Sequence, residues 1–95
     1  MNMDFFRNEL APLLSRYEIK YSNFSNGALG DLERVEFEGE GKVGTIDFWS
    51  SDWLGIDVFD LNLNDQTINV LLNPEEEVKK KETMEMLKMI LVSRE

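Results

Sequence analysis

The sequence contains neither cysteine nor histidine. Without cysteine the chain forms no disulfide and offers no thiolate to zinc. Without histidine it also lacks the usual general base near neutral pH and the commonest ligand of transition metals. These two absences disfavour most hydrolase and nuclease mechanisms, so we expect no catalytic residue, no cofactor and no bound metal.

Basic residues are also scarce, because 10 lysines and arginines stand against 19 aspartates and glutamates, for a net charge of -9. Residues 31 to 65 hold ten of the acidic residues and only two basic ones. A field of this sign repels nucleic acid and anionic membranes, and it speeds encounter with a basic protein. We therefore expect no direct contact with nucleic acid or membrane, although a merely soluble acidic surface would have the same composition.

Long apolar runs are missing as well. No segment approaches the roughly 20 apolar residues that a membrane helix needs, and the opening MNMDFFRNEL lacks the apolar run of a signal peptide. The sequence therefore predicts a cytoplasmic protein. With 95 residues, of which 42% are hydrophobic, the composition is that of one globular domain covering residues 1–95.

The two ends of the chain carry helical patterns. From Met3 to Tyr17 apolar residues recur at helical spacing, which predicts an amphipathic helix. Asp4 is placed to cap this helix, and Pro12 predicts a kink because proline lacks the amide that an inner turn needs.

The second helical pattern runs from Pro74 to Val92. Asn73 is placed to cap it, and three glutamates follow in the first turn, where the helix dipole favours acidic side chains. The three lysines at 79–81 predict a solvated face. The predicted apolar stripe consists of Val78, Thr83, Leu87, Ile90 and Leu91, widened by Met84 and Met86.

Between these helices the sequence alternates with the period of β-strands. The predicted strands are residues 19–22, 32–38, 42–49, 53–61 and 66–72. Turn formers at Asn26-Gly27 separate the first two, and Gly39-Glu40-Gly41 predicts a hairpin between the next two. Connections this short favour antiparallel pairing. The predicted fold class is α+β, with an antiparallel four- to five-stranded sheet flanked by N-terminal and C-terminal helices.

Two of the central strands place acidic and aromatic side chains on one face. Their aliphatic residues alternate inward, so Asp47 and Trp49 of one strand and Asp57 and Phe59 of the next point to the other side. Aromatic anchors beside charged residues are typical of protein–protein hot spots. The candidate partner-binding residues are this set with the residues at its rim: Asp47, Trp49, Asp52, Trp53, Asp57, Phe59 and Asp60.

Other interpretations of these residues stay open. A helix could cover this face too, which would make Trp49 and Phe59 core residues. Asp47 and Asp57 could split their pKa values as an acid–base pair, but nothing beyond residue type supports catalysis. Residues 60–65 resemble the start of a calcium loop but lack the glycine and the bidentate glutamate that such a loop requires. A hairpin turn is therefore the better interpretation of that segment.

The central segment FWSSDWLGIDVFDL, with EFEGEGKVGTI before it and NVLLNPEEE after it, resembles the TriTu-type immunity family of bacterial contact-dependent growth inhibition systems. The resemblance spans residues 36–77. It implies a cytoplasmic protein that binds and neutralises the C-terminal nuclease domain of a toxin, in this family a tRNase that engages elongation factor Tu. Elongation factor Tu would then be reached only through the toxin.

A protein of another class fits the same residues. The chain could be a small acidic structural or regulatory interaction module, for example a homodimer, without a toxin partner. Both interpretations expect a protein that binds another protein and is not an enzyme. They differ in the partner, because an immunity protein requires a basic toxin nuclease domain.

Overall fold

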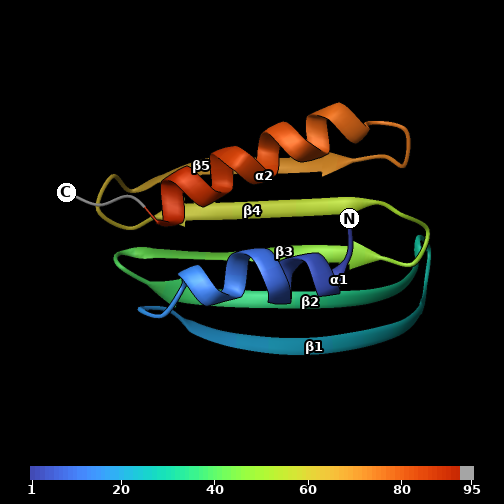
Figure 1. The fold of residues 1–95 in the computed structure, drawn as a ribbon, viewed down its shortest axis with the longest axis horizontal. Helices are drawn as coiled ribbons and strands as arrows, with labels where there is room; N and C mark the ends of the chain where they lie inside the picture. Colours follow the sequence, from blue (N-terminus) through green and yellow to red (C-terminus); the bar gives the residue numbers. More distant parts are fainter. Residues whose placement is uncertain (93–95) are drawn as a thin grey trace.

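The computed structural model describes residues 1–92, which form a five-stranded antiparallel sheet with all helices on one face (Figure 1). The strands lie in sequence order, so each one pairs with its neighbour in the chain. They are β1 (Glu18–Gly27), β2 (Gly30–Gly39), β3 (Lys42–Trp49), β4 (Leu54–Asp60) and β5 (Asp65–Leu72). The predicted α+β class and antiparallel sheet are confirmed.

The N-terminal helix consists of three short pieces, α1 (Met3–Phe5), a π-helical turn (Phe6–Leu10) and a 3-10 turn (Ala11–Leu13). It ends at Leu13 rather than at Tyr17. Pro12 has no amide to donate to the preceding turn, and it lies where the π-helical turn gives way to the 3-10 turn. The predicted cap was also wrong. Asn2, not Asp4, caps the helix, and its Oδ1 accepts a 3.0 Å hydrogen bond from the amide of Phe5.

Two tight turns connect the first three strands. The predicted turn at Asn26-Gly27 was wrong by two residues, because β1 continues through an irregular pairing and turns at 28–29. The hairpin at Gly39-Glu40-Gly41 is confirmed, with Gly39 opposite Lys42. Glu40 and Gly41 have φ values of 50° and 77°, and positive φ at both central residues gives the turn that matches the twist of paired strands.

The C-terminal helix α2 (Glu77–Leu91) begins three residues later than the sequence pattern suggested. Asn73 caps a separate turn before it: Asn73 Oδ1 accepts from the amide of Glu75, and the Glu76 carboxylate accepts from the amide of Asn73. The apolar stripe is also rotated from the predicted one. Val78 is 69% exposed, whereas Lys80, predicted to be solvated, is 1% exposed.

The core lies between the helices and a single face of the sheet. Figure 1 shows the N-terminal helix over β2 and β3, and α2 over β4 and β5. The strands supply the lower layer of this core with Val35, Phe37, Ile46, Phe48, Leu54, Ile56, Val58, Ile68 and Leu72. Because both helices pack on this covered face, the opposite face of the sheet has no helix over it within residues 1–92. The interpretation in which a helix covers Trp49 and Phe59 is therefore wrong.

Within residues 1–92, no helix combines the length and the apolar character needed to cross a bilayer.

Candidate protein-binding face

The candidate site is the sheet face that carries no helix, which we call the open face. Strand pairing aligns its side chains in rows that run across β1 to β4. The row at one end is apolar, with two aromatic residues, and consists of Phe24, Leu32 and Trp49. The second row consists of Ser22, Arg34, Asp47 and Gly55, and the third of Lys20, Glu36, Thr45 and Asp57. The row at the other end consists of Glu18, Glu38, Val43 and Phe59. The open face thus has aromatic rings at both ends, and its glutamates lie toward the end that carries Phe59.

The structure places Asp47 on the open face as predicted, but in an ion pair that the sequence analysis missed. Arg34 grips its carboxylate with two hydrogen bonds, 2.8 Å from Nε to Oδ1 and 3.1 Å from Nη2 to Oδ2. These bonds raise the pKa of the Arg34 guanidinium above its ordinary value, and the guanidinium carbon lies 5.4 Å from the centre of the Phe24 ring. Asp47 therefore keeps little free charge for a partner.

Trp49 is half-buried and lies against the backbone of Gly55 on the neighbouring strand. A Cβ atom at position 55 would stand 3.2 Å from the ring carbon Cζ3 of Trp49, which is closer than ordinary packing. The missing side chain lets the indole rest on the sheet, an arrangement in which an aromatic ring covers a strand glycine. The glycine thus lets the indole of Trp49 pack against the backbone of β4.

Asp57 and Phe59 also project from the open face, on β4. Asp57 is exposed, and its Oδ1 accepts a 2.5 Å hydrogen bond from Nε2 of Gln66. Phe59 is half-buried and stands directly opposite Val43 in the pairing of β3 with β4. Asp57 is paired with Thr45 and Asp47 with Gly55, so the two aspartates lie in different rows, and each already has a hydrogen-bonding partner.

Two of the predicted rim residues do not belong to the open face. Asp60 is 9% exposed and lies on the covered face, where its carboxylate accepts from the amides of Asn62 and Leu63 in the β4–β5 turn. Asp52 has a φ of 73° in the β3–β4 turn, and its carbonyl accepts a 2.6 Å hydrogen bond from Nζ of the buried Lys80. Both aspartates therefore support turns. Strand parity alone would have placed position 60 on the covered face, with Leu54, Ile56 and Val58.

Trp53, the third predicted rim residue, is half-buried at the end of the β3–β4 turn, and its carbonyl accepts from the amide of Trp49.

The ammonium group of Lys80, which holds the same turn, also lies 3.4 Å from the carboxylates of both Asp52 and Glu77. Sequence reasoning missed Lys80 because a run of three lysines beside three glutamates usually forms a solvated face. The turn beneath the end that carries Trp49 is thus fixed from the covered side.

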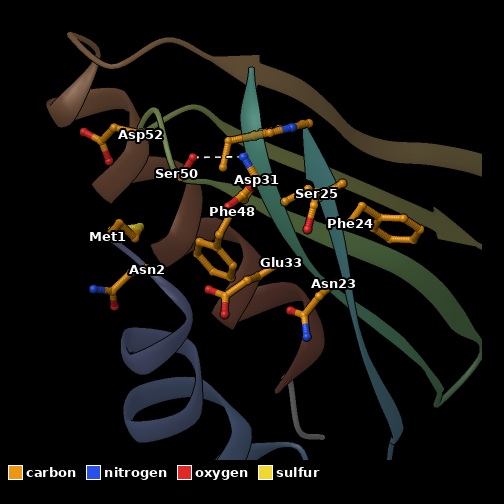
Figure 2. Close-up of a pocket in the computed structure, with 12 residues that line it drawn as sticks. Met1, Asn2, Asn23, Phe24, Ser25, Asp31, Glu33, Phe48, Ser50 and Asp52 are labelled. Atoms are coloured by element: carbon orange, nitrogen blue, oxygen red, sulfur yellow. Dashed lines mark hydrogen bonds between the residues drawn. The ribbon is translucent and has the colours of Figure 1, made fainter. Parts of the chain in front are cut away.

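A cavity of about 490 Å³ lies at the same end of the molecule (Figure 2). Phe48 and Glu33, which are paired across β2 and β3, face Asn2 across it. At its edge Asp31 accepts from the amide of Asn26, and its own amide donates to Oγ of Ser50. These contacts of Asp31 and Ser50 hold the ends of β1, β2 and β3 together.

No protein family model, no curated protein and no solved structure matches this chain.

Proposed function

We propose that this chain is a non-catalytic immunity protein that binds a basic toxin nuclease domain through the open face of its sheet. The observation that carries the proposal is the combination on one uncovered face of half-exposed aromatic rings, Trp49 and Phe59, with the carboxylates of Glu38 and Asp57. Aromatic residues supply contact area at low entropic cost, and the surrounding charges select the partner.

The charge of the chain supports a basic partner. A nuclease must attract phosphate and therefore tends to carry positive charge, which a protein of net charge -9 would complement. Such complementarity raises the association rate and disfavours acidic competitors. The proposed partner is the C-terminal domain of a contact-dependent inhibition toxin, with a tRNase as the expected activity. Binding would take place in the cytoplasm, and elongation factor Tu would be met only through the toxin.

The rigidity of the face supports inhibition by binding rather than by chemistry. Arg34 fixes Asp47, Gly55 seats Trp49, and Gln66 holds Asp57, so these side chains are ordered before a partner arrives. Preorganised contacts reduce the entropy lost on association. A face of this kind suits a protein that must bind its target tightly.

The test is a calorimetric titration against the toxin domain encoded beside the gene, at low and high salt. We expect tight binding that weakens with salt, and a loss of about tenfold or more in affinity for Asp57→Lys. The matched control is Glu85→Lys, which makes the same charge change at an exposed position of α2. Equal losses in the two variants would move the interface away from the open face.

Failure of the wild-type protein to bind would contradict the toxin-immunity proposal. It would favour the alternative of an acidic interaction module without a toxin partner. Unfolding of each variant is followed by circular dichroism, because Asp57 and Glu85 are both exposed and neither change should alter the fold.

A further inference from the structure

We propose that the open face holds its partner through a band of apolar side chains at one end, and that the partner presents there an apolar side chain flanked by lysine or arginine. The apolar band consists of Phe24, Leu32, Trp49 and Leu71. This inference rests on the proposed function for the identity of the partner. It adds Phe24, Leu32 and Leu71 to the binding face, and the sequence pattern singled out none of these three.

The apolar band crosses the sheet from one edge strand to the other. Phe24 of β1, Leu32 of β2 and Trp49 of β3 are paired in one row, and Leu71 of β5 stands opposite Gly55 in the next. The indole of Trp49 lies over Gly55 and thereby extends the apolar surface toward Leu71. Phe24 is 49% exposed and Leu71 is 54% exposed. Neighbouring exposed apolar side chains of this kind mark interaction sites in soluble proteins.

The cavity at this end of the molecule adjoins the apolar band (Figure 2). Phe24, Leu32 and Trp49 line it together with the buried ring of Phe48. Its volume of about 490 Å³ falls within the roughly 300–1,000 Å³ of ligand pockets. The band therefore combines an exposed apolar surface with a depression into which a side chain of the partner can insert.

The charges beside the apolar band favour a basic partner. Among the described residues, the lining of the cavity carries the carboxylates of Asp31, Glu33 and Asp52 and no lysine or arginine. Asp52 already contacts Lys80, so the negative field on this side comes mainly from Asp31 and Glu33. A lysine or arginine next to the apolar residue of the partner would meet these carboxylates, which gives the contact its specificity.

The same charges argue against a second copy of this chain as the occupant. Two copies each carry a net charge of -9, and like charges brought together across an interface lower the affinity. Arg34, the basic residue in the row beside the band, is bound to Asp47 and therefore does not serve the carboxylates of another copy. The occupant is a protein that surrounds its apolar contact with basic residues.

The first experiment compares Leu71→Ala with Leu63→Ala in the toxin titration. Both leucines are exposed, and Leu63, at 68%, lies in the β4–β5 turn outside the band. We expect Leu71→Ala to lower affinity about tenfold or more, as truncation of an apolar anchor does, and Leu63→Ala to lower it less than about twofold. Equal losses in the two variants would overturn the inference. Circular dichroism checks that both variants remain folded, as expected for exposed positions.

A second measurement needs no toxin. Tryptamine and indole-3-acetate share an indole ring but carry opposite charges, so together they separate apolar contact from charge recognition. Each is titrated into the isotope-labelled protein, and the backbone amides and the indole N–H of Trp49 are followed by NMR. We expect tryptamine to shift the signals of the apolar band more than indole-3-acetate does, and to shift them less in Leu71→Ala than in Leu63→Ala. Equal shifts with both compounds, or shifts spread evenly over the surface, would overturn the inference.

The two experiments separate the two proposals. If the toxin does not bind but tryptamine maps to the apolar band, the band stands as a site for cationic apolar groups and the toxin-immunity proposal fails. If the toxin binds and Leu71→Ala behaves like Leu63→Ala, the toxin-immunity proposal stands and the band fails. A concentration-dependent dimer that Leu71→Ala abolishes, measured by light scattering, would identify a second copy as the occupant and would also overturn the inference.

Discussion

The two faces of the sheet are made by the same strands but differ in how deeply their apolar side chains are buried and in how their charged side chains are paired. On the covered face Val35, Phe37 and Ile46 are at most 1% exposed and pack in a continuous core. On the open face Trp49 and Phe59 remain half-exposed, and two glutamates stand opposite each other. The difference shows that burial of apolar surface is concentrated on one face, which leaves the residues of the other available for the binding that we propose.

We expect the largest difference in the free energy of unfolding between alanine variants of two phenylalanines on opposite faces. Phe37→Ala removes a fully buried ring that meets Tyr17 edge to face, so we expect a loss of about 3–5 kcal/mol in the free energy of unfolding. Phe59→Ala should cost only about 1–2 kcal/mol because its ring is already partly solvated. Urea unfolding measures both, and equal losses would show that the open face supports folding as much as the covered one.

We expect a smaller difference in stability between alanine variants of two strand glycines. The added methyl group in Gly44→Ala would meet the backbone carbonyl of Asp57 and lie 2.7 Å from the Phe37 ring, so we expect a loss of about 1–3 kcal/mol. In Gly55→Ala it meets only the edge of Trp49, which can move toward solvent, and the loss should stay below about 1 kcal/mol. The comparison uses thermal unfolding, and a reversed order would contradict it.

The smallest effect concerns pH and belongs to the covered face. Burial raises the pKa of the Tyr17 hydroxyl, with a further contribution from Glu40, and the hydroxyl donates a 2.8 Å hydrogen bond to the carbonyl of Leu91. A raised pKa means that the folded protein holds this proton more tightly than the unfolded chain. This contribution to stability is therefore complete below the ordinary pKa of 10.0 and is lost as pH rises through the folded value.

The matching variant is Tyr17→Phe, which removes the titrating group and keeps the ring. Its stability should be slightly lower than that of the wild type below pH 10.0, and it should lack this part of the alkaline loss. Denaturation at a series of pH values measures the difference. An unchanged alkaline slope in Tyr17→Phe would assign the loss to other groups.

Local patterns predicted most of the sheet. Alternation located β3, β4 and β5 to within a residue at each end. The glycines around Glu40 predicted the hairpin, although the two positive φ values belong to Glu40 and Gly41 and not to Gly39. The ends of the helices were harder to predict from the sequence. Asn2 outcompetes Asp4 as a cap through one hydrogen bond, and the turn at Asn73 resembles the start of a helix that begins only at Glu77.

The candidate face could be predicted only in part. Strand parity placed Asp47, Trp49, Asp57 and Phe59 on it, but the engagement of Asp47 depends on the register of β2 with β3, which brings Arg34 opposite it. The opposed glutamates depend in the same way on the register of β1 with β2. A shift of one residue in the register of two strands changes every such pair. Alternation within a single strand therefore cannot predict which side chains meet across strands.

The buried ammonium group of Lys80 gives the docking of α2 a chemical reporter. An amine-reactive reagent modifies a lysine only when the nitrogen meets solvent, and this side chain is 1% exposed, while Lys79 and Lys81 on either side of it are exposed. Its modification therefore requires α2 to leave the β3–β4 turn, whereas its neighbours react in the folded protein. The ratio of the rates at these adjacent lysines thus reads out the free energy of local opening, with an internal reference in the same peptide.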